Sequence, residues 1–422
     1  MLLERRTKRL GEYSAFSKRS LRSMRSTSSL VLICIGVFLG IGSPRPVHAQ
    51  VGLTAYNFQV VQPHPFVHAL GNATVAARGY PGAIGVNPAT IGTEGAVRAG
   101  STLNLSRGPA YSSPWFRSQF WIAAPSATGK IGPWAGGIQV KHFSRGDTEI
   151  RNPQGERVFS GSVFEQAIKL VGAYDLTSSV TVGGGVNLIR SRGVYQFDGK
   201  IKTHPTIDVG VHYQAEAEQG FVKLRPSLGL SITDFGGNVS VQARPGDLAA
   251  PTTIRGGGAL QLTAQSMHFG RPEWRVGFYG ALSNQLVSGT FVEDEGTEYF
   301  DADGPFKGLF SGWGSTRGVF MRSGERAEVG PWERITKHVG AEMSVLDLLS
   351  VRLGRFHESD DNGGRQYTVL GVGLDAYYVS LDASWDFRDE PVDQLSYGRL
   401  TVRIPLSDSP RNFWPALLGG GD

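Results

Sequence analysis

Three glycine-rich stretches can be compared with the nucleotide-binding loops of other proteins. Residues Gly371 to Ala376 read GVGLDA and match the dinucleotide pattern G-x-G-x-x-A, which should open a helix after a strand. The residues that follow alternate as a strand does, so this stretch is better interpreted as part of a sheet. The glycine triplets at 183–185 and 256–258 lack the Lys-Ser/Thr of a phosphate-binding loop. We expect these triplets to allow strand bending instead.

Two further groups contain the residue types of metal ligands. His64 and His68 are four residues apart with no Glu between them, and Pro65 disfavours the helix that such a zinc site needs. The run DADG at 301–304 resembles the start of a calcium loop, but Gly312 stands where the closing glutamate is expected. A hydrated outer loop is the better interpretation. We therefore expect neither a metal nor a cofactor.

Residues 1–49 have the three parts of a secretory signal peptide. A basic region is followed by an apolar run from Leu30 to Ile41 and by the small-residue cleavage pattern Val47-His48-Ala49. Met24 would give a signal of more ordinary length, so the true start could be there. Twelve apolar residues are too few to cross a bilayer as a helix. We predict export, with residues 1–49 removed.

Export changes how the composition is interpreted. Residues 1–49 carry a net charge of +7 while the whole chain carries +5, so the remainder is at −2 and offers no support for nucleic-acid binding. The single cysteine, Cys34, lies inside the signal, so the mature chain has no thiol nucleophile. A G-x-S-x-G motif is also absent. We expect no enzyme activity.

Alternating apolar and polar residues recur in segments of about ten residues, which is the weak signal of membrane barrels. In GRLTVRIPL, Leu400, Val402, Ile404 and Leu406 form one face and Arg399, Thr401 and Arg403 the other. A soluble sandwich would also alternate, so single segments decide nothing. Equivalent alternation predicts these lumen-facing polar residues: Glu165, Lys169, His338, Glu342, Asp382, Arg399 and Arg403.

The connections between these segments favour a barrel over a sandwich. Fourteen strands are predicted, and the connections after even strands are mostly short while those after odd strands are longer. Membrane barrels have this arrangement, with short turns on the periplasmic side and long loops outside. Six aromatic residues near strand ends suit the membrane interface: Trp115, Trp121, Trp134, Tyr213, Trp274 and Trp385. The strands are expected at 96–106, 114–124, 134–144, 161–174, 180–190, 206–215, 227–236, 254–265, 274–285, 336–345, 350–357, 367–374, 376–386 and 397–406.

Residues 50–95 are built differently from the strand segments. VHALGNATVAARG predicts a short helix, and a Gly/Pro-rich stretch follows it. The run Ala69-Leu70-Gly71-Asn72-Ala73 and the tripeptide Asn87-Pro88-Ala89 resemble the N-terminal segment of the PorV/PorQ branch of the FadL-like outer-membrane barrel superfamily. Blocks such as SGSVFEQAIKLVGAYDLTSSVTVGGGVNLIRS and VGAEMSVLDLLSVRLGR follow in the same order, and the resemblance extends over most of residues 60–405.

The resemblance implies an all-β membrane barrel of about 14 antiparallel strands at 96–406, with residues 50–95 as a plug, or hatch, in the lumen. It carries Asn87, Pro88 and Ala89 over as hatch residues, although an ordinary turn also fits them. It implies an outer-membrane protein in contact with lipid and associated with type IX-like secretion, whose partners would be secreted cargo or secretion machinery. The alternative is a FadL-like passive channel for hydrophobic small molecules. Residues 407–422 would form a C-terminal tail, where many barrels instead end on an aromatic residue.

Overall fold

A computed structural model describes residues 54–92, 96–104, 121–151, 157–194, 200–241, 246–294, 297–320, 326–387 and 396–405. The predicted signal peptide, Trp115, Leu406 and the predicted tail lie outside these residues. Among the described residues, no helix is both long enough and apolar enough to span a membrane.

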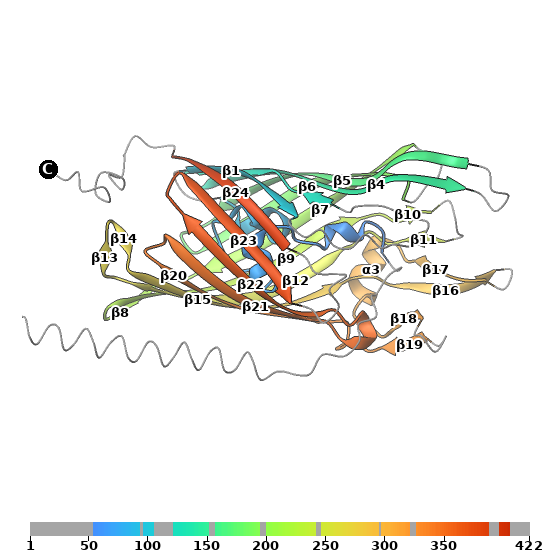
Figure 1. The fold of residues 1–422 in the computed structure, drawn as a ribbon. Helices are drawn as coiled ribbons and strands as arrows, with labels where there is room; N and C mark the ends of the chain where they lie inside the picture. Colours follow the sequence, from blue (N-terminus) through green and yellow to red (C-terminus); the bar gives the residue numbers. More distant parts are fainter. Residues whose placement is uncertain are drawn as a thin grey trace, which may run out of the picture. The chain divides into compact units, whose positions relative to one another are not determined.

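The described chain from Ala96 onward is a closed antiparallel β-barrel with fourteen strand positions (Figure 1). β1 pairs with β24 at one seam, from Ala96 opposite Pro405 to Asn104 opposite Tyr397. The wall contains β1 (Ala96–Asn104), β2 (Trp121–Ala123), β3 (Ser126–Ile131), β4 (Trp134–Arg151), β5 (Arg157–Asp175), β6 (Val180–Arg192), β7 (Ile201–Gln214), β9 (Val222–Gly236), β12 (Thr253–Ala264), β15 (Trp274–Gln285), β20 (Thr336–Val345), β21 (Leu349–His357), β22 (Gln366–Asp375), β23 (Val379–Phe387) and β24 (Ser396–Pro405).

The predicted second strand differs most from the structure. β2 and β3 together fill one strand position, since both pair with β1 on one side and β4 on the other. Pro125 lies between them, and a proline cannot donate to a strand ladder. The described strand therefore covers 121–131 instead of 114–124, and residues 114–120 lie outside the described part.

The two ends of the barrel differ as the parity of the connections predicts. Among the described residues, one end, the short-turn end, has tight connections and the small hairpins formed by β8 (Ala217–Gln219) with β9 and by β13 (Met267–His268) with β14 (Arg271–Pro272). The other end, the loop end, has β10 (Val239–Ser240), β11 (Asp247–Leu248), β16 (Gly289–Asp294), β17 (Thr297–Ala302), α3 (Pro305–Ser311), β18 (Thr316–Phe320), β19 (Arg326–Val329) and η4 (Asp360–Asn362). Figure 1 shows these groups at opposite ends.

The predicted loop at 145–161 is partly wrong. β4 continues to Arg151 and β5 begins at Arg157, so most of this segment is a long hairpin beyond the barrel wall (Figure 1). This segment is rich in polar residues and glycine and has few of the apolar residues from which alternation is recognised, although Phe159 and Val163 of β5 are buried.

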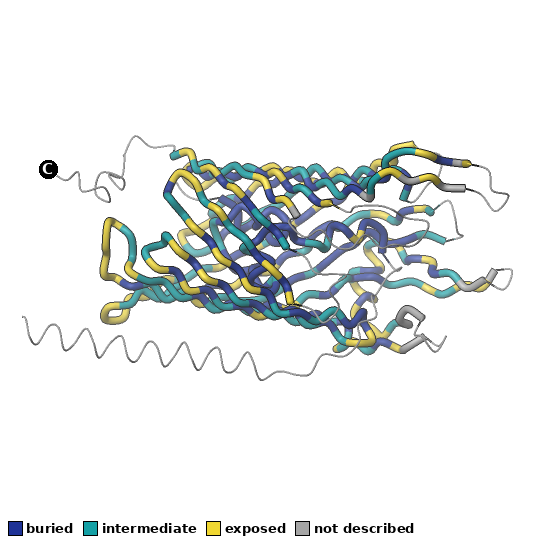
Figure 2. Tube along the Cα trace, in the orientation of Figure 1, coloured by how far each residue is buried: buried dark blue, intermediate teal, exposed yellow. Residues whose placement is uncertain are grey.

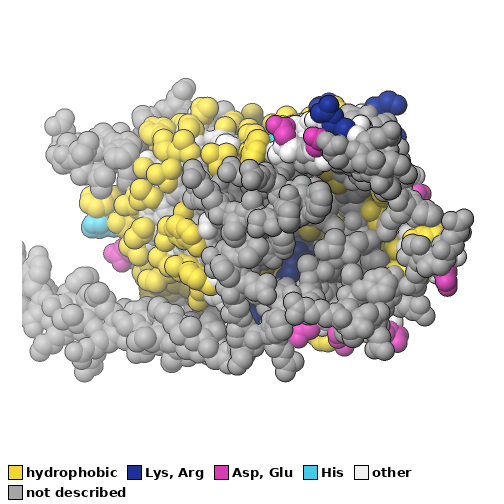
Figure 3. Space-filling model, turned by 45° about the vertical axis from the view of Figure 1, so that its right-hand side comes forward, with side chains coloured by type: hydrophobic (Ala, Val, Ile, Leu, Met, Phe, Trp, Pro, Cys, Tyr) yellow, Lys and Arg dark blue, Asp and Glu magenta, His cyan; other side chains and the backbone are white. Residues whose placement is uncertain are grey.

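The outer face of the wall is apolar and the inner face is polar. On β24, Leu400, Val402 and Ile404 are 51%, 42% and 53% exposed, whereas Arg399 and Thr401 are buried. Buried and exposed positions alternate along the wall in Figure 2, and hydrophobic side chains gather over the wall in Figure 3. Exposed aromatic residues lie near both ends of the wall, such as Trp134 and Tyr213 at the short-turn end and Trp121 at the loop end. This is the architecture of an outer-membrane barrel.

The turn between β22 and β23 corrects the start of the strand predicted at 376–386. Tyr377 is buried and has a φ of 72°, so it does not continue the outer face with Val379. The strand begins only at Val379. GVGLDA lies at the end of β22 and in this turn, so it opens no helix.

Candidate functional site: the hatch and the lumen

The described hatch, residues 54–92, lies inside the barrel, where Figure 1 shows it in blue. It contains η1 (Asn57–Gln59), α2 (Pro65–Ala69), η2 (Pro81–Gly85) and η3 (Pro88–Thr90). Most of its buried apolar side chains between Val67 and Ile91 form a core with the wall residues Val171, Ala173, Tyr279 and Ala281. Burial of this apolar surface is the main term that favours docking of the hatch.

Glycines of the wall let the hatch backbone approach closely. A Cβ added to Gly229 would lie 2.2 Å from the Val75 carbonyl oxygen, and one added to Gly183 would lie 2.5 Å from the Ala89 nitrogen. The same holds on the opposite side of the lumen, where Gly354 faces the nitrogen of Gly71. Gly183 was predicted to allow strand bending, but its surroundings show a different role: any side chain there would push the hatch away.

The tripeptide Asn87-Pro88-Ala89 lies at the centre of the hatch. Asn87 caps η3, and its Oδ1 accepts a hydrogen bond of 3.0 Å from the Ala89 N–H. Its Nδ2 donates to the Val75 carbonyl at 2.9 Å and to the Val211 carbonyl of β7 at 3.2 Å. Asn87 is fully buried. One amide therefore joins two hatch segments to the barrel wall, in a segment without a strand ladder to satisfy its backbone.

The helix in the hatch is shorter than predicted and begins earlier. α2 starts at Pro65, since a proline is well accommodated at the first helical position, where its missing N–H is not needed. His64 caps this helix by accepting the Phe66 N–H at 3.2 Å. Burial, assisted by the positive charges of Arg399, Arg352 and Arg98, holds the pKa of His64 well below its usual range. His64 is therefore neutral at pH 7.

His68, the second histidine of the pair considered for zinc, is used in other contacts. Its Nδ1 lies 3.0 Å from the Ser384 hydroxyl, and its Nε2 lies 3.8 Å from Asp386 Oδ2. In the part of the chain that the structure describes, no three His, Cys, Asp or Glu residues cluster as metal ligands would. In the DADG run, Asp303 pairs with Lys307 at 2.6 Å and Asp301 accepts the Asp247 N–H at 3.0 Å.

Lys141 of β4 is a functional candidate that the sequence did not indicate. Its buried ammonium donates to the hatch carbonyls of Gln59 at 3.0 Å and Val61 at 2.9 Å, with Phe58 at 3.5 Å. Lys141 alternates with its neighbours along β4 and lies on the inner face, as many other polar residues of the wall do. What distinguishes Lys141 from these other polar residues is that its hydrogen-bond partners are backbone carbonyls some 80 positions earlier in the chain.

Among the predicted lumen residues, Glu165 and Lys169 are buried on β5. Lys169 pairs with Asp208 at 2.7 Å and with Asp234 at 3.4 Å. Asn187 donates to the same Asp234 carboxylate at 2.7 Å. This cluster links neighbouring strands of the wall.

Glu342 and Asp382 lie on the far side of the lumen and share one partner. Arg352 donates through Nε to Glu342 at 2.9 Å and through Nη1 to Asp382 at 2.7 Å. Asp382 stands opposite Arg399 in the register of β23 and β24. The ion pair nevertheless goes to Arg352.

His338 connects the wall to the hatch. Its Nδ1 is 2.8 Å from the Gly71 carbonyl, and its Nε2 is 2.8 Å from the Ser283 hydroxyl. Because a carbonyl can only accept, Nδ1 carries the proton and Nε2 accepts from Ser283.

The two predicted lumen arginines of β24 differ from each other. Arg399 donates to Thr401, Thr102, Ser126 and the Ala124 carbonyl, so it bridges the break between β2 and β3. Loss of the Arg399 side chain would leave these partners unsatisfied. Arg403 makes no comparable side-chain hydrogen bonds to the described residues, and its guanidinium lies 5.0 Å from the centre of the Tyr377 ring.

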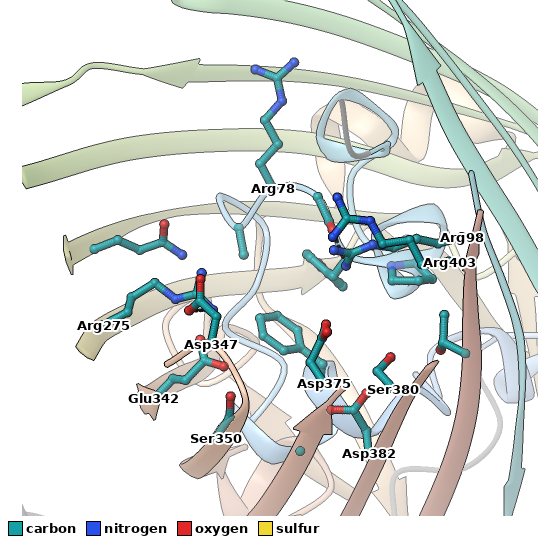
Figure 4. A pocket seen from close by; sticks show the side chains of 18 of the residues that line it. Arg78, Arg98, Arg275, Glu342, Asp347, Ser350, Asp375, Ser380, Asp382 and Arg403 are labelled. Atoms are coloured by element: carbon teal, nitrogen blue, oxygen red, sulfur yellow. Dashed lines mark hydrogen bonds and ion pairs between the residues drawn. The ribbon is translucent and has the colours of Figure 1, made fainter. Parts of the chain in front are cut away.

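A cavity of about 580 Å³ lies between the hatch and the short-turn end. Hatch residues 76–81 form one side of it, and the turn residues Arg271, Asp347 and Asp375 form another. Figure 4 shows charged side chains from several strands converging on it.

Comparison with known proteins finds no matching family model and no matching curated relative. Membership of the PorV/PorQ family remains a prediction. The fold is similar to that of the toluene transporter TbuX of Ralstonia pickettii, with 12% identity over 83% of this chain and 98% of the other and a TM-score of 0.40. A FadL homologue of Pseudomonas aeruginosa is 12% identical over 85% of this chain and 100% of the other, with a TM-score of 0.40. The toluene transporter TodX of Pseudomonas putida is 10% identical over 85% of this chain and 97% of the other, with a TM-score of 0.41.

Proposed function

We propose that this barrel is a plugged outer-membrane channel that passes small hydrophobic molecules when the hatch moves. The observation that carries the proposal is how the hatch is held. Among the described hatch residues, the one strand-type pairing is the isolated bridge between Thr54 and Ala249. The remaining contacts are side-chain hydrogen bonds, such as those of Asn87 and Lys141, ion pairs such as that of Arg78 with Asp175, and apolar packing. The hatch can therefore shift without any wall strands separating.

The substrate class is inferred from the loop end. Phe306 and Phe310, one turn apart on α3, are 71% and 83% exposed, and Trp313 and Trp332 are also exposed. Phe306 rests edge-on against Phe235 with ring centres 5.3 Å apart. Exposed apolar patches of this kind mark interaction sites. Here they would collect hydrophobic solutes above the hatch.

The secretion-associated role predicted from the family resemblance takes second place, because it rests on the resemblance alone. It also requires a cargo surface, whereas channel function requires a movable plug and an apolar entrance. The two roles differ in what a loosened hatch changes: solute flux in a channel, and handling of exported proteins in a secretion partner.

The experiment is Asn87→Ala, measured in proteoliposomes with a small aromatic hydrocarbon and with glucose as a polar comparator. The substitution leaves the Val75 and Val211 carbonyls without their amide partner, at about 1–3 kcal/mol for each buried group. We expect faster hydrocarbon flux through an intact barrel. Asn238→Ala is the matched control, since among the described residues this amide donates to the Ala302 carbonyl of β17 and to no other group.

Hydrogen exchange of the hatch amides is measured on the same samples. If the hatch is loosened and hydrocarbon flux stays at the wild-type level, channel function is wrong. Defective export of secreted proteins in cells carrying the variant, with flux unchanged, would favour the secretion role.

A further inference from the structure

The cavity below the hatch is lined by eight Lys and Arg side chains. Six of them form ion pairs with carboxylates: Arg78 and Lys130 with Asp175, Arg225 with Glu216, Arg271 with Asp375, Arg275 with Asp347, and Arg352 with Glu342 and Asp382. The four acidic side chains in the lining are thus all engaged by Arg271, Arg275 and Arg352. The remaining two cations are Arg98 and Arg403.

Arg98 and Arg403 are direct partners in the register of β1 and β24. In Figure 4 their guanidinium groups lie next to each other and point into the cavity. Neither forms an ion pair with a carboxylate of the described residues. Arg98 donates to the Gly79 carbonyl at 3.1 Å, while the buried Nε of Arg403 has no hydrogen-bond partner among them.

Two like charges opposite each other on neighbouring strands destabilise a sheet. An anion between them would remove this repulsion and accept hydrogen bonds from both guanidinium groups. Arginine is well suited to the task because its planar fork matches the two oxygens of a carboxylate or a phosphate. The cavity of about 580 Å³ is within the range of small-molecule sites, roughly 300–1,000 Å³.

We propose that Arg98 and Arg403 form a binding site for the oxyanion group, carboxylate or phosphate, of a small solute in the cavity between the hatch and the short-turn end. This site goes beyond the proposed channel function, since it holds whether or not the hatch moves. It also adjoins the hatch directly, because Arg98 bonds Gly79 and the Gly79 N–H donates to Thr90 at 3.0 Å.

The test is isothermal titration calorimetry of the full barrel in detergent, with inorganic phosphate and with citrate as separate probes. Saturable binding of either probe at millimolar concentration is expected, and the probe that binds identifies the oxyanion class. Arg98→Gln and Arg403→Gln should each weaken binding about tenfold or more, since each removes a charge-assisted hydrogen-bonding group. Added sodium chloride should weaken it as well.

Arg225→Gln is the matched control, since it removes the same charge from the same cavity lining but from a guanidinium already bonded to Glu216 at 2.8 Å. It should keep wild-type affinity. Thermal unfolding gives a second readout. The binding probe should raise the midpoint for the wild-type protein and for Arg225→Gln, and leave that of Arg403→Gln unchanged.

Two results would overturn the site. One is the absence of saturable binding by both probes to the folded barrel. The other is an equal loss of affinity in Arg225→Gln and Arg403→Gln, which would mean that the general positive potential of the cavity, and not this pair, attracts the anion.

Discussion

Lys141→Met tests whether one buried ammonium holds the first part of the hatch. Methionine keeps the length and apolar stem of lysine but cannot donate, so the Gln59 and Val61 carbonyls lose partners at 3.0 and 2.9 Å. Each unsatisfied buried carbonyl costs about 1–3 kcal/mol. Relief from burying the ammonium offsets part of that cost. We expect local opening of residues 57–61 to become easier by about 2–4 kcal/mol.

The assay is amide hydrogen exchange of the folded barrel in detergent, followed at residues 57–61 and in the wall strands. At about 1.4 kcal/mol per factor of ten, exchange in this segment should accelerate roughly 30- to 700-fold. The wall strands should keep their protection, since Lys141 bonds hatch carbonyls.

Lys169→Met is the control for loss of a buried lysine. Its partners Asp208 and Asp234 belong to β7 and β9, so the effect should appear in those strands. Unchanged exchange at 57–61 in Lys141→Met, or acceleration spread evenly over the wall, would refute the idea that Lys141 clamps the hatch.

Three further changes test the wall and the hatch. Leu400→Arg should make the free energy of membrane insertion about 2–4 kcal/mol less favourable, measured as folding into lipid vesicles, whereas Leu400→Phe should fold normally. Equal folding of the two variants would mean that the outer face is misassigned. Gly229→Ala should displace the hatch at Val75 and accelerate exchange there, whereas Gly280→Ala, with nothing within 4 Å of the added Cβ, should not; matching profiles would contradict the close-approach role. His64 has a lowered pKa in the folded state, so its stabilisation is present above its unfolded pKa near 6.5 and is lost as the pH falls below it. Hatch exchange should therefore rise with acid, and His64→Asn, which keeps a capping oxygen, should flatten the dependence; an equally steep profile in that variant would assign the titration elsewhere.

The sequence by itself determined the barrel wall. Lipid on one side and a polar lumen on the other impose a period of two on each strand, so alternation alone separated Leu400 and Val402 from Arg399 and Thr401. The regular exchange of short turns and long loops then favoured a barrel over a sandwich. The same signal failed at β2 and β3, where Pro125 breaks the strand, and at residues 145–151 of β4 and 157–160 of β5, where few apolar residues are present to mark the alternation.

Only the tertiary structure decided which inner residues act together. Lys141 meets carbonyls some 80 positions earlier in the chain, and Arg98 becomes the neighbour of Arg403 only when β1 and β24 close the barrel. Such contacts depend on strand register and closure, and a shift of one residue would turn every side chain to the other face. Local sequence fixes which face a residue occupies, whereas its partner across the lumen is set by closure of the whole ring and by the path of the hatch inside it.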